Sequence, residues 1–284
     1  MPDTESQYQW VLRDLGLSFA RTFPLTRTEV STLLCSISEG DNTAAAMVAD
    51  IKVTASKGYC RRAGMIDSDQ QLTHFGEEVV IHDPNMVRAE TLWLIHYFLS
   101  APHYSTPNFW GDLVAKKLAV GTVLNTEVIK ARIAEFAIET TGTEPSDSTL
   151  DSAATSFLGT YSRKIGLHEL GIFPQKLEKS GEVKEQSGQY FMSTPQPIPT
   201  AAFACILADY WQAKFPNTAS IDEELLTQSE LPRLLLLGTD GFNAKLAELA
   251  DPQLGHVQRQ RRFTPPQVLR RWTDPAPLWA ALYA

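Results

Sequence analysis

Basic side chains in a predicted helix near the start of the chain have the chemistry to contact nucleic acid. The helix is expected over residues 43–63, with four basic residues and one acid, Asp50, for a net charge of +3. Arginine suits this role because its planar guanidinium can form two hydrogen bonds at once to phosphate or guanine. A solvated face or a docking face for an acidic partner protein are the alternatives. The residues predicted to contact DNA here are Lys52, Thr54, Lys57, Arg61 and Arg62.

A second basic segment lies near the end of the chain, over residues 256–272. It holds five arginines and no acid, whereas the whole chain has a formal charge of −8. Its arginines could bind phosphates, pair with acids of the same chain, or dock a partner. Pro265 suits the first turn of a helix, so the segment is expected to continue as a helix that buries Trp272. The predicted phosphate contacts are Arg259, Arg261 and Arg262.

Signatures of catalysis and of metal binding are poor. The sequence has no nucleophile elbow, zinc-protease motif, P-loop or dinucleotide fingerprint. His96 and His103 are separated by a proline, so a satisfied helix histidine is a better interpretation of His96 than a metal ligand. Cys60 lies beside two arginines, which could activate its thiol, but a small buried residue is the stronger expectation. We therefore predict no catalytic residue, no metal and no cofactor.

Composition narrows the class of protein. The 284 residues are 43% hydrophobic and 20% charged, which is typical of a folded globular chain. The net negative charge argues against a general nucleic-acid coat, although a local basic face remains compatible. Three scattered cysteines, a polar first segment and a longest apolar run of residues 201–208 predict a cytoplasmic protein without a membrane span.

The elements that position these residues are mostly helical. Helices are expected over 8–19, 28–37 and 43–63, then a small hairpin at 64–73 and a helix over 75–81 that Thr73 can cap. Helix, turn, helix and hairpin in this order favour a winged helix-turn-helix unit over a generic helical domain.

A similar order recurs further along the chain. Helices over 89–100, 109–118, 125–139 and 148–161 precede expected strands at 170–172 and 190–192, which flank a long charged wing at 176–189. After a helix over 199–213, a short helix at 221–228, a strand at 231–237 and helices at 242–249 and 278–283 are expected. We therefore predict a mainly α fold of two winged helix-turn-helix-like units with small β-hairpin wings plus a helical C-terminal tail. The predicted regions are 1–85, 86–213 and 214–284.

Five segments, taken in order, resemble a known family. They are FARTFPL at 19–25, YCRRAGMI at 59–66, LTHFG at 72–76, ETLWLIH at 90–96, and the helix at 148–161 followed by LGI at 170–172. This order resembles the bacterial domain-of-unknown-function family four-thousand-and-seven over nearly the whole chain. The chain departs from the pattern in its long wing at 176–189 and at Gly58, which raises the question of whether the first basic helix is straight.

The resemblance implies a genomic setting rather than an activity. By this resemblance the gene is expected in the setting where family members often lie, beside phosphoadenosine-phosphosulfate-reductase-like proteins in DNA-modification and antiphage islands such as phosphorothioation systems. The favoured hypothesis is a noncatalytic DNA-binding or adaptor subunit, with double-stranded DNA and island-encoded proteins as partners. A winged-helix transcription regulator acting as a homodimer and a DNA-modifying enzyme with an unrecognised site are the alternatives.

Overall fold

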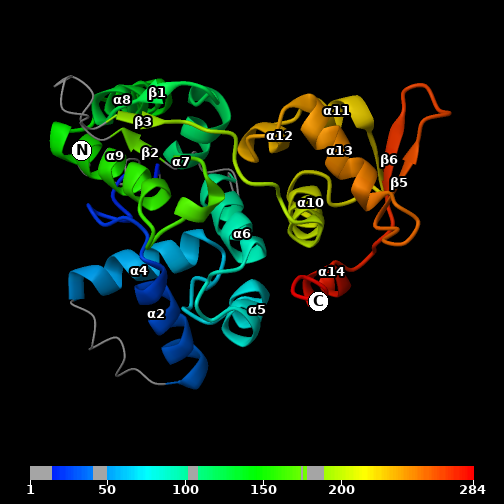
Figure 1. The fold of residues 1–284 in the computed structure, drawn as a ribbon, viewed down its shortest axis with the longest axis horizontal. Helices are drawn as coiled ribbons and strands as arrows, with labels where there is room; N and C mark the ends of the chain where they lie inside the picture. The colour runs from blue at the N-terminus through cyan, green and yellow to red at the C-terminus, as the bar shows by residue number, and fades with distance from the viewer. Residues whose placement is uncertain (1–14, 41–49, 102–107, 174, 178–188) are drawn as a thin grey trace, which may run out of the picture.

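The computed structural model describes residues 15–40, 50–101, 108–173, 175–177 and 189–284. The chain is mainly helical with two small antiparallel sheets, which confirms the predicted class (Figure 1). Residues from all three predicted regions share one continuous hydrophobic core. Within these ranges no helix is both long and apolar enough to cross a bilayer.

The N-terminal helices follow the predicted order. A one-residue bridge between Ile66 and Leu72 closes the small hairpin between the second and third helices. The hydroxyl of Thr73 accepts a hydrogen bond from the Gly76 amide, so the predicted cap is confirmed. The first helix ends at Gly40, whose φ of 68° is readily adopted by glycine. The helices are α2 (Arg27–Glu39), α4 (Asp50–Arg62) and α5 (His74–His82).

Gly58 does not interrupt α4, which is continuous from Asp50 to Arg62. It instead allows the chain that precedes α2 to pass close to the helix, because a Cβ at this position would lie 2.8 Å from the backbone oxygen of Phe19. Residues 15–19 form turns, so the end of the helix predicted over 8–19 is wrong, and its earlier part lies outside the described residues.

The central helix α6 (Ala89–Ser100) matches its predicted bounds and is buried nearly all round. It contacts α4 on one side, and α7 and α10 on others, so it joins the two halves of the molecule (Figure 1). Trp93 on this helix is 1% exposed and lies in the core.

The middle of the chain combines two long helices with a three-stranded sheet. The strand order is β1-β3-β2, with Val123 opposite Phe191 and Lys176 opposite Tyr190. Asn125 caps the first long helix through a hydrogen bond from the Val128 amide. The elements are α7 (Phe109–Asp112), the π-helical turn η1 (Leu113–Lys117), β1 (Val123–Leu124), α8 (Thr126–Thr141), α9 (Asp147–Ser162), the 3-10 turn η2 (His168–Leu170), β2 (Gln175–Leu177) and β3 (Gln189–Phe191).

Two predictions in this region need correction. The helix predicted over 148–161 begins one residue earlier, at Asp147, and Ser146 caps it. The strand predicted at 170–172 is wrong: the segment continues from η2 through Gly171, which has a φ of 72°. A short apolar run does not by itself distinguish strand from turn. The wing residues 178–188 lie outside the described part.

The C-terminal region is a helix-and-sheet unit that contains helices as predicted, but the helix predicted after Pro265 is wrong. Residues 256–272 form a β-hairpin instead of a helix, and its second strand pairs with a strand from residues 220–222 in the order β4-β6-β5. The apolar run 231–237 starts as a helix, since Pro232 occupies its first turn. The elements are α10 (Thr200–Lys214), β4 (Ser220–Asp222), α11 (Glu223–Gln228), α12 (Leu231–Leu234), α13 (Thr239–Leu249), β5 (Val257–Gln260), β6 (Gln267–Arg270) and α14 (Ala276–Ala280).

The end of the chain returns to the N-terminal helices. The ring of Trp279 packs at 5.9 Å from that of Phe75 and at 6.4 Å from that of Phe98. The hydroxyl of Tyr283 lies 2.7 Å from that of Thr91, and the Tyr283 ring lies under the guanidinium of Arg88. These contacts place α14 beneath α10 and beside α5 in Figure 1.

Candidate nucleic-acid interface

Some of the residues of α4 that were predicted to contact DNA are exposed, and some of them bind other parts of the protein. Lys52 and Thr54 are exposed, but the ammonium of Lys52 lies 3.0 Å from the Glu29 carboxylate on α2. Lys57 is half-buried. Arg61 is exposed, and its guanidinium donates a 3.3 Å hydrogen bond to the backbone oxygen of Ser68 in the small hairpin. The outer face of α4 is therefore basic, although part of its charge is neutralised by α2.

Arg62 has a largely structural position. Its guanidinium carbon lies 4.8 Å from the centroid of the Phe19 ring, a cation–π geometry. The same guanidinium packs on Gly16, where a Cβ would lie only 2.7 Å away. Gly16 has a φ of 78°, so a residue without a side chain suits both the backbone and the arginine. Arg62 thus holds the segment before α2 against α4.

The arginines of the C-terminal segment are presented by the β5–β6 hairpin. Gln260 pairs with Gln267 at the end of the ladder, and the six residues between them, 261–266, are all exposed. Arg261, Arg262 and Phe263 lie at this tip, and the Phe263 side chain is 59% exposed. We call residues 261–266 the hairpin tip. It projects from the right-hand end of the molecule in Figure 1.

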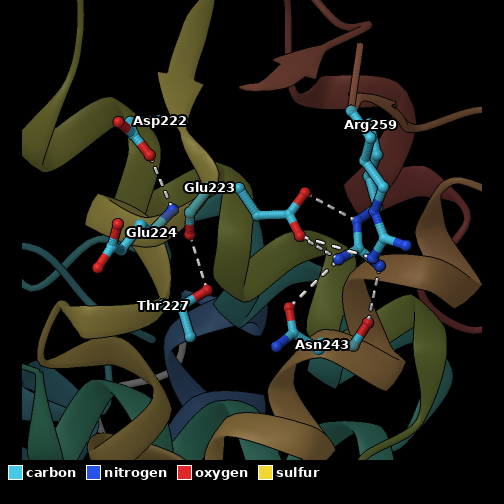
Figure 2. Close-up of polar contacts among 7 residues, drawn as sticks. Asp222, Glu223, Glu224, Thr227, Asn243 and Arg259 are labelled. Atoms are coloured by element: carbon cyan, nitrogen blue, oxygen red, sulfur yellow. Dashed lines mark hydrogen bonds and ion pairs between the residues drawn. The ribbon is translucent and has the colours of Figure 1, made fainter. Parts of the chain in front are cut away.

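Arg259 differs from its neighbours because its side chain holds the hairpin against α11 and α13. We call its contacts with Glu223 and Asn243 the brace. Its guanidinium forms a two-point ion pair with the carboxylate of Glu223 at the start of α11. It also donates 3.2 Å hydrogen bonds to the backbone and side-chain oxygens of Asn243 on α13 (Figure 2). The side chain is 10% exposed. This arrangement favours the intramolecular alternative for Arg259.

The brace also determines the charge around the tip. The hydrogen bonds from Arg259 hold the pKa of Glu223 below its usual range, so the carboxylate stays ionised. A guanidinium nitrogen of Arg261 lies 3.6 Å from the same carboxylate, but 65% of the Arg261 side chain remains exposed. Glu223 is bound chiefly to Arg259. The side chains of Arg261 and Arg262 therefore keep the tip positively charged.

A cavity of about 750 Å³ lies beside this brace, between α11, α12 and the start of α13. Glu223, Glu224 and Asn243 line one part of it, and Arg233 and Thr239 another. The sequence gives no sign of this cavity, because its lining combines parts of residues 223–243 with the distant Pro266, and residues 231–237 were expected to form a strand.

The residues considered for catalysis are buried and satisfied. His96 is fully buried, with its ring nitrogens 2.8 Å from the Tyr161 hydroxyl and 2.8 Å from the Leu234 oxygen, which confirms the interpretation as a satisfied histidine. Burial raises the pKa of the Cys60 thiol to about 12, so a reactive thiol is not expected there. His103 lies outside the described residues. Among those described, no group of three or more histidine, cysteine or acidic residues is arranged around a metal position.

Most of the chain matches one protein family. The family described as "Protein of unknown function (DUF4007)" matches residues 47–274, which contain α4, both sheets and the hairpin tip. This chain belongs to the DUF4007 family. The resemblance inferred from the ordered segments is therefore confirmed. No curated protein matches this DUF4007 chain.

Solved structures share the fold of this DUF4007 chain at low sequence identity. A structure described as "Magnesium ion-bound SspB crystal structure" has a TM-score of 0.71 and 17% identity, covering 93% of this chain and 86% of its own. One described as "SspB crystal structure" has a TM-score of 0.69 and 16% identity over the same shares. At this level of identity the similarity extends to the fold alone.

Proposed function

We propose that this protein is a DNA-binding subunit of a bacterial DNA-modification or defence system. The observation that carries the proposal is one chain topology that occurs twice. In the middle region the order is helix, β1, α8, α9, β2, β3, and the third strand lies between the other two. The C-terminal region has a similar order, α10, β4, α11, α13, β5 and β6, with the short helix α12 inserted between α11 and α13, and its sheet order β4-β6-β5 is equivalent. This order and the central third strand support our proposal that both units are winged helix-turn-helix-like.

The N-terminal helices supply a third, shorter version. α2 and α4 form the helix pair, and the bridge between Ile66 and Leu72 closes a minimal wing after α4. In helix-turn-helix proteins the second helix of the pair enters the major groove. Here that helix is α4, with Lys57 and Arg61 on the side away from the buried Ala55 and Tyr59. The island setting that the family resemblance implies agrees with a role on DNA.

Duplex binding across a salt series tests the proposal. A labelled DNA duplex is titrated with the full chain between about 50 and 200 mM salt, where each phosphate contact contributes about 0.9 to the slope of log affinity against log salt. We expect measurable binding with a negative slope. The double change of Lys57→Gln and Arg61→Gln should make this slope less steep by the contribution of roughly one to two phosphate contacts.

The matched control is Lys214→Glu, which changes the net charge of the chain by the same amount at an exposed position on α10. It should leave the slope unchanged. Absence of duplex binding at the lowest salt would reject the proposal and favour the adaptor alternative, in which the basic faces dock an acidic partner protein.

A second candidate is a metal-dependent enzyme acting on DNA, because one matched structure is described as bound to magnesium. The described residues do not fit such a site. The run of three consecutive acids, Asp222, Glu223 and Glu224, is already engaged: Glu223 binds Arg259, and the Asp222 carboxylate accepts a 2.9 Å hydrogen bond from the Glu224 amide (Figure 2). Supercoiled plasmid incubated with Mg²⁺ or with EDTA tests this candidate. Relaxed or linear product in the Mg²⁺ sample alone would support it.

A further inference from the structure

The C-terminal unit presents two surfaces of opposite charge to a partner. Its longest exposed helix, α13, has the sequence TDGFNAKLAEL, with two acids and one lysine. Asp240 and Glu248 are exposed on it, whereas the Lys245 side chain is 15% exposed and its ammonium lies 2.6 Å from Glu248. The outer face of α13 is therefore negative and would repel the DNA backbone.

The hairpin tip has the opposite character. It carries Arg261 and Arg262 without an acid among its six residues, and Phe263 extends from it into solvent. Arginines beside an exposed apolar ring have the chemistry of minor-groove contact, in which guanidiniums enter the negative potential of a narrow groove and an apolar ring wedges against a base step.

The brace fixes the direction of this tip. Arg259 ties β5 to α11 through Glu223 and to α13 through Asn243, just two residues before the tip begins. The tip is thus held on a rigid sheet while its own side chains stay exposed. We infer that the C-terminal unit contacts duplex DNA through the minor groove with Arg261, Arg262 and Phe263, and that α13 stays outside the major groove. The inference rests on the proposed function.

The test uses the full chain and a labelled duplex. Arg261→Gln with Arg262→Gln should flatten the slope of log affinity against log salt by about 1.8, the value expected for two phosphate-region contacts. Phe263→Ala should weaken binding on the order of tenfold without changing that slope, because a wedge contributes stacking and no charge. Netropsin, which occupies the minor groove of A·T-rich DNA, should compete with the wild-type chain and not with a variant that combines Arg261→Gln, Arg262→Gln and Phe263→Ala.

The control changes the helix instead. Asp240→Asn with Glu248→Gln removes two acids from α13 and should leave affinity equal or slightly higher. A large loss of affinity in this variant, or an unchanged slope in the arginine variant, would overturn the inference while the duplex binding of the wild type still supports the proposed function. If wild type binds no duplex, the proposed function itself has failed. Loss of an acidic partner protein by the arginine variant, with duplex binding intact, would also overturn the inference.

Discussion

The Nε2 atom of His96 lies 2.8 Å from the backbone oxygen of Leu234, and this contact joins the central helix α6 to α12 in the C-terminal unit. Because a carbonyl can only accept, Nε2 carries the proton. Nδ1 then accepts a hydrogen bond from Tyr161, whose oxygen accepts in turn from Trp110 Nε1 at 2.8 Å. Four elements are connected through one neutral imidazole.

Stability should therefore decrease as the pH falls from about 6.5 toward 4. Burial lowers the pKa of His96 from 6.5 to about 4. Between these two pH values His96 is therefore protonated in the unfolded chain and neutral in the folded chain. The neutral state of His96 contributes about 3 kcal/mol to the free energy of unfolding above pH 6.5, and this contribution is lost by pH 4. Urea unfolding measured at several pH values checks this.

Two variants isolate the contribution of His96 from that of the carboxylates. His96→Gln should have a flatter dependence of unfolding free energy on pH between about 6.5 and 4 than the wild type, whatever its absolute stability. His74→Gln, at a position where the side chain is 49% exposed, is the matched histidine control. Parallel curves for wild type and His96→Gln would show that His96 does not titrate in this way.

Local signals predicted the N-terminal half well because each depends on neighbours in sequence. The Thr73 cap and the bounds of α6 are of this kind. The C-terminal half depends on distant partners. Val268 is a strand residue because it pairs with Ile221 and Arg259 on either side, and no window around Pro265 contains that information.

The candidate site shows the same limit. Arg259, Arg261 and Arg262 look equivalent in the sequence, yet one is a brace and the others lie at the hairpin tip. The difference comes from Glu223, 36 residues away, which reaches Arg259 because β4 leads directly into α11 at the edge of the same sheet. Which member of a basic cluster is neutralised is thus a property of the tertiary structure.

Gly58→Ala should destabilise the protein, although alanine is the better helix former. At an ordinary helix position the change is worth about 1 kcal/mol in favour of alanine. Here the new Cβ would lie 2.8 Å from the Phe19 backbone oxygen, and a backbone group cannot turn away as a flexible side chain can. We expect a net loss of about 1–3 kcal/mol in chemical denaturation.

Gly241→Ala on α13 is the matched comparison. The nearest atom to its Cβ would be a Leu237 side-chain carbon at 3.4 Å, an ordinary contact. This variant should be stabilised by up to about 1 kcal/mol. Equal effects of the two substitutions would argue that the segment before α2 does not press on α4.

Trp93→Ala should lower the free energy of unfolding by about 3–5 kcal/mol, because a ring that is 1% exposed would leave a cavity in the core beside the centre of α6.

Trp93→Phe and Trp110→Phe separate packing from hydrogen bonding. In the described residues Trp93 Nε1 has no hydrogen-bond partner, whereas Trp110 Nε1 donates to Tyr161. Trp110→Phe should therefore cost about 1 kcal/mol more than Trp93→Phe in thermal or urea unfolding. The reverse order would mean that the Tyr161 network adds little to stability.

The different roles of the arginines at 259 and 261 should appear directly in stability. Arg259→Met leaves Glu223, 15% exposed, without its two-point partner, and should lower the unfolding free energy by about 2–3 kcal/mol. Arg261→Met removes an exposed side chain and should change it by less than about 0.5 kcal/mol. Calorimetric melting of both variants at neutral pH provides the comparison.

The same pair predicts a pH dependence with a definite sign. Since Arg259 lowers the pKa of Glu223 in the folded chain, the pair stabilises the fold above the ordinary pKa of a glutamate, and this stabilisation is lost as the pH falls and the carboxylate is protonated. Glu223→Gln should remove that part of the acid sensitivity and, combined with Arg259→Met, should cost less than the sum of the two single changes. Additive losses would show that the two side chains stabilise the hairpin independently, and that the brace does not act as a pair.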